Sequence, residues 1–211
     1  MTKLKHIILD MDGTLSNTAK ATGTAIKKVE SRFNLPPITD DIIRDAMGIA
    51  GLDFYRHMFP TVPEDTLIKL EPEVDALELA AIQELKRAIL FPGVVEMLTA
   101  LQQAGINMYI ASTGSNVHVN GTLQAAEIKH FFAGIHSGEP AKIEMVRRIV
   151  GGGNPFFPSE WAMVGDMYKD SEAARGSGIL ALGAGFGYLA EEDHTLFDAV
   201  LKTPEDILNY I

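Results

Sequence analysis

Hydrophobic positions along this chain of 211 residues follow two patterns. One short apolar run near the start, Ile7–Leu9, is bounded by polar residues and is typical of a buried strand. From residue 19 to residue 90, apolar residues recur at helical intervals without a convincing strand pattern. From Pro92 onward, short apolar runs alternate regularly with helical segments. The chain is therefore expected to combine a helical block with a series of alternating strands and helices.

The boundaries of these elements follow from the same periodicities. In the helical block, helices are expected over residues 19–33, 40–47, 52–59 and 64–90, with an irregularity near Pro72 because proline removes a backbone donor. In the second half, strands are expected over residues 107–111, 132–135, 161–164, 179–182 and 199–201, with helices between them and a closing helix over 204–210.

Repeated strand-helix-strand units predict the fold class. Such units form a parallel sheet with helices on both faces, so an α/β fold is expected, with a doubly wound (Rossmann-like), mostly parallel sheet and an inserted all-helical cap subdomain. The core domain is predicted to comprise residues 1–15 and 91–211, and the cap residues 16–90.

Composition narrows the possible partners. Hydrophobic and charged contents of 46% and 22% are ordinary for a globular protein, and no apolar segment is long enough for a membrane span, so a cytoplasmic protein is expected. The chain has no cysteine, and its histidines show no metal-ligand spacing, which argues against zinc. A net charge of −10 without a basic stripe argues against nucleic acid. A monomer or a homodimer is expected.

The first strand ends in two aspartates, Asp10 and Asp12, followed by Gly13. Residues two apart on an extended chain point the same way, and two close carboxylates repel each other unless a cation or a shared proton intervenes. A hard, oxygen-liking metal is therefore expected. A simple turn could use the same residues. A calcium-binding EF-hand loop is excluded because Leu15 and Ala21 stand where Gly and Glu are required.

Two later strand ends carry similar chemistry. Ser112 and Thr113 follow the strand over 107–111, where hydroxyls and backbone amides could hold a phosphate oxygen or could equally cap a helix. Asp166 follows the strand over 161–164 and stands where Asp10 stands on its own strand, and Asp170 lies in the first turn of the next helix. Because the carboxyl ends of parallel strands share one edge, these residues are expected to face a common site.

Two further groups of charged residues lie outside these strand ends. Lys142 opens a helix, where a solvated lysine is the ordinary interpretation, but beside the carboxylates and a bound phosphate it would be the local cation that a negative protein needs. The stretch from Glu64 to Glu84 holds seven acids and one lysine, and we interpret it as a solvated helix face without chemistry.

Taken together, these segments resemble the four motifs of the haloacid dehalogenase superfamily, in order and over essentially the whole chain. The motifs are Asp10-Met11-Asp12-Gly13-Thr14-Leu15, Ser112, Lys142 and Gly165-Asp166-Met167-Tyr168-Lys169-Asp170. The helical block resembles the cap of the phosphoglycolate-phosphatase-like branch, and the segments 90–94 and 183–188 are similar to that branch as well. The chain departs from the pattern at Asn120-Gly121 and at the residues Glu-Pro-Ala that precede Lys142.

The resemblance implies a mechanism. Asp10 would attack phosphorus and form an aspartyl-phosphate, and Asp12 would protonate the departing alcohol and then accept a proton from water. Neighbouring carboxylates would raise the pKa of Asp12 for this task.

It also implies a set of ligands. Mg²⁺ would bind Asp10, the main-chain carbonyl of Asp12, and Asp166, with Asp170 binding directly or through water. Ser112, the Thr113 amide and Lys142 would neutralise the phosphate oxygens. The implied substrate is a small phosphate monoester, such as phosphoglycolate, a sugar phosphate or a nucleotide, selected by the cap.

Other functions share parts of this pattern. A capped phosphomutase has the same core and differs in its product. A signalling receiver domain also uses a phosphorylatable Asp, acidic metal ligands, a hydroxyl and a lysine, but it is shorter, has no cap and lacks an equivalent of Asp12. A dinucleotide site at Gly183–Gly187 is a weaker alternative because the last glycine of the usual fingerprint is replaced by Tyr188.

Overall fold

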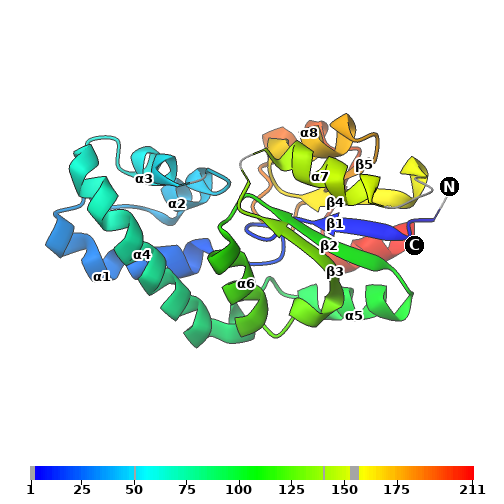
Figure 1. Cartoon of the computed structure of the whole chain (residues 1–211), viewed down its shortest axis with the longest axis horizontal. Helices are drawn as coiled ribbons and strands as arrows, with labels where there is room; N and C mark the ends of the chain where they lie inside the picture. The colour runs from blue at the N-terminus through cyan, green and yellow to red at the C-terminus, as the bar shows by residue number, and fades with distance from the viewer. Residues whose placement is uncertain (1–2, 50, 140, 153–156) are drawn as a thin grey trace.

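The centre of the molecule is a parallel sheet of six strands in the order β3-β2-β1-β4-β5-β6, and every adjacent pair is parallel (Figure 1). The computed structural model describes residues 3–49, 51–139, 141–152 and 157–211. The strands are β1 (His6–Leu9), β2 (Asn107–Ser112), β3 (Phe132–Ser137), β4 (Trp161–Gly165), β5 (Leu180–Ala184) and β6 (Ala199–Leu201). The predicted α/β class and doubly wound parallel sheet are therefore confirmed.

Helices cover both faces of this sheet (Figure 1). They are α5 (Val94–Gln103), α6 (Asn116–Ala125), α7 (Lys142–Gly151) and α8 (Tyr168–Gly176), joined by the 3₁₀ helices 129–131, 158–160, 191–196 and 204–210. Ile7 and Leu9 pack into the core on the α5 and α6 side, whereas Ile8 packs into the core on the α7 and α8 side. Because Ile7–Leu9 of β1 are buried against both faces, this part of the strand is an unbroken apolar run.

A helical block lies at the end of the sheet that is remote from the two chain termini (Figure 1). It consists of α1 (Ala19–Phe33), α2 (Asp40–Ala46), α3 (Leu52–Met58), α4 (Glu64–Leu85) and the 3₁₀ helix 86–89, and no extended strand occurs among its described residues. Most of its buried apolar side chains form a separate cluster of their own, although Ala21, Ala81, Ile82 and Ile89 join the core of the sheet.

The two connections between the block and the sheet run side by side. Ser16 forms isolated bridges with Asp12 and Leu90, and the Phe91 amide donates to the Leu15 carbonyl over 3.0 Å. The division of the chain at residues 15/16 and 90/91 into two domains stays a prediction.

The structure corrects three details of the predicted elements. Helix α4 continues through Pro72, because Leu70 and Val74 on either side are buried in the helical block, and the change to 3₁₀ geometry comes at Lys86, whose φ is 51°. Strands β2 and β4 each extend one residue further than predicted, to Ser112 and Gly165. The closing segment 204–210 is a 3₁₀ helix.

Pro140, which belongs to the residues noted before Lys142, and residues 153–156 lie outside the described residues. Among the helices that are described, none combines the length and the apolar character needed to cross a membrane. The cytoplasmic location and the monomeric or homodimeric state stay predictions.

Candidate active site

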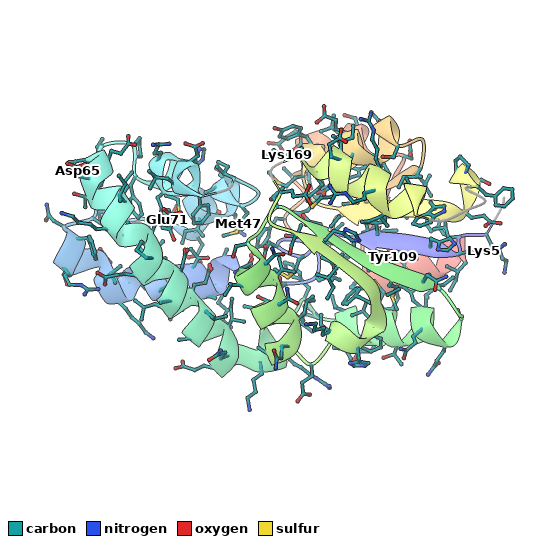
Figure 2. The ribbon with its side chains drawn as sticks, in the orientation of Figure 1. Lys5, Met47, Asp65, Glu71, Tyr109 and Lys169 are labelled. Atoms are coloured by element: carbon teal, nitrogen blue, oxygen red, sulfur yellow. The ribbon has the colours of Figure 1, made fainter. Side chains whose placement is uncertain are left out.

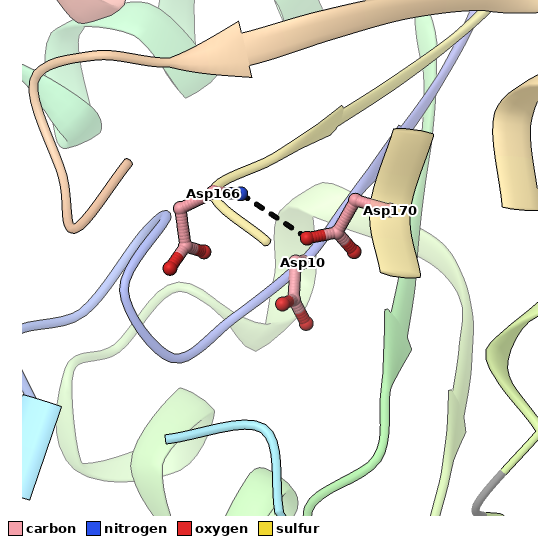
Figure 3. A group of neighbouring side chains, drawn as sticks. All are labelled: Asp10, Asp166 and Asp170. Atoms are coloured by element: carbon pink, nitrogen blue, oxygen red, sulfur yellow. Dashed lines mark hydrogen bonds between the residues drawn. The ribbon is translucent and has the colours of Figure 1, made fainter. Parts of the chain in front are cut away.

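Three buried aspartates meet at the carboxyl edge of the sheet. Strands β1 and β4 are neighbours with Leu9 beside Val164, so Asp10 and Asp166 leave the same edge, and the Asp10 amide donates to the Val164 carbonyl over 2.9 Å. Asp170 comes from the first turn of α8. One carboxylate oxygen from each residue lies within 4.8 Å of those of the other two (Figure 3). The structure thus brings together residues some 150 positions apart, as the sequence predicted.

The approach of Asp170 depends on a glycine. A Cβ atom at Gly165 would overlap the carboxyl group of Asp170. In the space that the missing Cβ leaves, Asp170 Oδ2 accepts hydrogen bonds from the backbone amides of Asp166 (3.1 Å) and Met167 (2.9 Å). Gly165 therefore lets the start of α8 fold back against the end of β4.

The variant Gly165→Ala is expected to lose about 1–3 kcal/mol of stability, because the added methyl group must displace a buried, hydrogen-bonded carboxylate. Urea denaturation measures this change. Gly151→Ala is the matched control, since a Cβ at Gly151 has no atom within 4 Å, and it is expected to be neutral or stabilising by up to about 1 kcal/mol. Equal stabilities of the two variants would contradict this account of Gly165.

Lys142 lies between two of these carboxylates. Its Nζ is 2.7 Å from Asp10 Oδ2 and 2.6 Å from Asp170 Oδ1, and all three side chains are buried. Burial alone would lower the pKa of Lys142, but the attraction of Asp10 and Asp170 outweighs it and raises the pKa. The side chain therefore stays a cation inside the site.

The aspartates carry more negative charge than Lys142 can balance. Burial, helped by Asp170 and Asp12, raises the pKa of Asp10 to about 7 although Lys142 acts against it. Burial together with Asp10 and Asp170 raises the pKa of Asp166 well above its usual range, in spite of a 2.6 Å hydrogen bond from Thr14 Oγ1 to Asp166 Oδ1.

A divalent metal fits these residues. Asp166 Oδ2 is buried and accepts no hydrogen bond from any described residue. A buried oxygen without a partner and a surplus of carboxylate charge are both costly, and a hard cation bound among carboxylate oxygens relieves both. The donor set consists of oxygens, which is the set that Mg²⁺ prefers.

The residues predicted to hold phosphate border the same space. Ser112 is buried at the end of β2, and its Oγ accepts a hydrogen bond from the Gly114 amide over 3.1 Å. Ser112, Thr113 and Lys142 line a cavity of about 640 Å³ together with Asp10 and Asp12. The cavity therefore joins the aspartates to the hydroxyl, amide and ammonium groups that the sequence placed in the site.

Asp12 departs from the expectation that nearby carboxylates raise its pKa. Burial is the largest single cause and raises it, but the charge and hydrogen bond of His118, together with a hydrogen bond from Thr18 and the charge of Lys142, bring the pKa below its usual value. His118 Nε2 is 3.0 Å from Asp12 Oδ1 and 3.2 Å from Oδ2. The expectation was wrong because His118, which is 106 residues away in the chain, contacts Asp12 directly in the fold.

His118 is a site residue that the sequence analysis missed. Its Nδ1 lies 3.2 Å from Glu78 Oε2, so that each ring nitrogen faces a carboxylate. Burial lowers the pKa of His118, but Asp12 and Glu78 together raise it well above its usual range, so both nitrogens carry hydrogen and donate. The available signal was a histidine in the first turn of a helix that directly follows a strand end.

The helical block contributes the other wall of the cavity. Phe54 and Tyr55 of α3 and three acids of α4 line it, and Tyr55 Oη donates to Asp75 Oδ1 over 2.6 Å. The lining acids of α4 are Glu71, Asp75 and Glu78. Figure 2 labels Met47 and Glu71 in the helical block and Lys169 on α8, all of which line this cavity. The interpretation of the acidic stretch 64–84 as a solvated face is wrong for Glu78, whose largely buried carboxylate contacts His118, whereas Asp75 is exposed and Glu71 is part-exposed at the wall of the cavity.

The glycine-rich segment after β5 supports the loop that follows β1. The Tyr188 amide donates to the Gly13 carbonyl over 3.0 Å, and a Cβ at Gly187 would overlap that same carbonyl. Tyr188 Oη also donates to Asn17 Oδ1 over 2.6 Å. Through these contacts, residues 183–188 support the loop after β1 that carries the first aspartates. This structural role argues against the dinucleotide alternative.

The amino-acid sequence of this chain matches a known protein family. The sequence model described as haloacid dehalogenase-like hydrolase matches residues 7–184, which is most of the chain.

Individual proteins match over nearly the full length. A phosphoglycolate phosphatase from Agrobacterium fabrum is 26% identical over 93% of this chain and 90% of its own length. A phosphoglycolate phosphatase from Synechococcus elongatus is 28% identical over 99% of this chain and 97% of its own length. The solved structure of a haloacid dehalogenase-like hydrolase from Streptococcus pneumoniae superposes with a TM-score of 0.84 and 23% identity, covering 100% of this chain and 99% of the other. At that identity the structural match establishes the fold alone.

Proposed function

This chain belongs to the haloacid dehalogenase-like hydrolase family and is an enzyme, and on that premise we propose that it is a Mg²⁺-dependent phosphatase of small organic phosphate monoesters. The observation that carries the proposal is the meeting of Asp10, Asp166 and Asp170, with Lys142 paired to Asp10 and Asp170, beside a cavity that Asp10, Asp12 and Lys142 line. The signalling-receiver alternative is set aside, because the family match spans residues 7–184 and includes the helical block.

In the proposed reaction, a carboxylate oxygen of Asp10 forms a bond to phosphorus while the bond between phosphorus and the ester oxygen breaks. The departing oxygen takes a proton from Asp12 and leaves as an alcohol. For Asp12 to hold that proton, the negative charge of the bound phosphate would have to raise its pKa against the lowering effect of His118. A water molecule then attacks the phosphorus, gives its proton to Asp12, and phosphate leaves as the bond to Asp10 breaks. The position of Asp10 and Asp12 beside one cavity supports these roles.

The phosphate oxygens would be held by Ser112, the Thr113 amide and Lys142, which border the same cavity. Asp10, the main-chain carbonyl of Asp12, and Asp166 would hold Mg²⁺, and Asp170 would do so directly or through water. When bound, the metal would supply positive charge against the phosphate oxygens. The unpartnered oxygen of Asp166 supports this assignment.

Residues 16–90 would act as a cap and residues 1–15 and 91–211 as the core. The separate apolar cluster of the helical block and its two adjacent connections support a unit that can close over the cavity. Closure would exclude bulk water from Asp10 and would bring Glu71, Asp75 and Glu78 around the organic part of the substrate.

The proposed activity is tested by measuring phosphate release from a panel of monoesters, with and without a chelator. The panel should contain phosphoglycolate, sugar phosphates, glycerol phosphate and nucleotides. Metal-dependent release of phosphate from at least one member is the expected result. Formation of an isomeric sugar phosphate in place of free phosphate would identify a phosphomutase, and a purified protein that acts on no member would contradict the proposal.

Within that panel, esters with an uncharged polyol are expected to exceed phosphoglycolate by at least about tenfold in kcat/KM, which corresponds to about 1.4 kcal/mol. The reason is that Glu71 and Asp75, which line the cavity, would face the organic part of the substrate and repel a second carboxylate. The variant Glu71→Gln/Asp75→Asn is expected to reduce the preference. Glu84→Gln, an exposed change on the same helix, should leave it unchanged. A preference for phosphoglycolate would contradict this prediction.

A further inference from the structure

A continuous chain of four side chains connects the helical block to Asp12. It runs from Thr22 on α1 to Glu78 on α4, then to His118 on α6, and ends at Asp12. Thr22 Oγ1 donates to Glu78 Oε1, His118 Nδ1 faces Glu78 Oε2 over 3.2 Å, and His118 Nε2 faces Asp12 Oδ1 over 3.0 Å. The first two members belong to the helical block, and the last two to the sheet and its helices.

The backbone holds His118 in place for these contacts. Ser115 is the residue before α6, and its Oγ accepts a hydrogen bond from the His118 amide over 3.2 Å. Thr122 Oγ1, one turn further along, donates to the His118 carbonyl over 2.9 Å. The imidazole therefore projects from a capped first turn rather than from a free loop.

Gly121 explains how Glu78 reaches His118. Helices α4 and α6 lie next to each other (Figure 1), and a Cβ at Gly121 would be only 2.5 Å from Leu79 Cδ1. A glycine inside a helix ordinarily costs stability, so its presence here is consistent with a requirement for close approach of the two helices. Leu79 is the neighbour of Glu78, so Gly121 leaves room for α4 at the point where that helix presents Glu78 to His118. The glycine at the departure from the family pattern, Asn120-Gly121, thus lies where α6 packs closely against α4.

We propose that His118 and Glu78 are positioning residues for the proton transfer by Asp12. Glu78 orients the imidazole of His118, and His118 holds the carboxyl group of Asp12 where the departing ester oxygen leaves. Because Glu78 and Thr22 belong to the helical block, this positioning is complete only when the block lies against the sheet. The inference rests on the proposed phosphatase function and assigns no bond-making step to either residue.

A positioning role for proton transfer predicts a dependence on the leaving group. Nitrophenolate departs from phosphorus without a proton, whereas an alkoxide needs one. In the variant His118→Gln, the single-turnover rate of the first step with glycerol phosphate is expected to fall by about 10- to 100-fold, which is part of what a general acid contributes. The burst of nitrophenolate from nitrophenyl phosphate, which reports the same step without proton transfer, should fall by less than about threefold, since its leaving group bypasses that contribution.

Variants of Glu78 test the contact between Glu78 and His118. They also keep the inference testable if His118→Gln fails to fold. Glu78→Ala should show the same selective loss, at about 5- to 50-fold with glycerol phosphate, and Glu78→Gln, which keeps an acceptor oxygen for the imidazole, should recover part of it. Matched controls are His57→Gln and Glu84→Gln, which change the same residue types at exposed positions of the helical block. Thermal melts identify any variant that fails to fold, and the remaining variants then decide.

The outcomes are distinguishable. A selective loss with glycerol phosphate in His118→Gln or in Glu78→Ala supports the inference. Equal losses with both substrates, or no loss with either, would overturn it while leaving the phosphatase function intact. Absence of turnover by the unaltered protein on every monoester would reject the phosphatase function and this inference with it.

Discussion

The variant Asp10→Asn is expected to lose at least about 10³-fold in kcat with every phosphate monoester that the protein hydrolyses, because an amide cannot serve as the nucleophile that forms the phosphoenzyme. Asp10 is the buried aspartate that pairs with Lys142 and meets Asp166 and Asp170 at the end of β1. The measurement is steady-state phosphate release under conditions that saturate the unaltered protein.

The control for this prediction must keep the same chemical change away from the site. Asp65→Asn meets that need, because Asp65 is an exposed residue in the first turn of α4, in the helical block (Figure 2). Its activity should equal that of the unaltered protein. Because Asp10 and its neighbours repel one another, Asp10→Asn should remain folded, and circular dichroism checks this point. Retention of more than about a tenth of the activity by a folded Asp10→Asn variant would refute the role of Asp10 as nucleophile.

Removal of divalent metal is expected to abolish phosphate release, and adding Mg²⁺ back should restore it. The same binding should raise the melting temperature, because a ligand that binds only the folded state stabilises it by about 2.7 kcal/mol at a hundredfold excess over its Kd. For a domain of this size, that stabilisation corresponds to about 5–10 °C. A calorimetric or fluorescence melt measures the shift without reference to activity.

The rise in melting temperature on Mg²⁺ binding should depend on pH and on Asp166. Burial raises the pKa of Asp10 to about 7 and that of Asp166 well above its ordinary range, so the folded, metal-free protein holds protons that the unfolded chain has lost. The stability of the metal-free protein therefore falls as the pH rises from the ordinary pKa of an aspartate through the raised pKa values of Asp10 and Asp166. Because Mg²⁺ needs deprotonated carboxylates, its effect on the melting temperature should be larger at pH 8 than at pH 6.

Asp166→Asn tests the metal site directly, because the unpartnered oxygen belongs to this residue. The variant should lose most of the Mg²⁺-dependent shift, whereas Asp65→Asn should keep it. An equal shift in both variants would show that the ion acts elsewhere on this acidic protein. A shift of undiminished size at pH 6 would contradict the link to the raised pKa values.

The local sequence determined most of the fold and most of the proposed phosphate end of the site. The unbroken apolar run of β1 identified a strand buried on both faces, and the alternation after Pro92 identified the parallel sheet. Because the carboxyl ends of parallel strands meet at one edge, the positions of Asp10, Ser112 and Asp166 in the chain were sufficient to predict that Asp10 lies close to Asp166 and borders one cavity with Ser112.

The sequence could not reveal which side chains approach from the helical block. The acids of α4 are spaced like those of a solvated helix, and nothing in their order separates Glu78, which lines the cavity, from Glu84, which is exposed. The packing of α4 against α6 decides between them, because it places Glu78 beside His118. Periodicity records only which face of a helix is apolar.

The sequence by itself therefore determined where the strands lie, that they run parallel, and that four aspartates stand at or just after strand ends. These features follow from local periodicity and from the residues next to each strand. Only the tertiary structure decided the pKa of Asp12 and the involvement of His118 and Glu78. Ionisation depends on distances of a few ångströms between residues that are far apart in the chain, and such distances are fixed by the packing of whole helices, which no local pattern encodes.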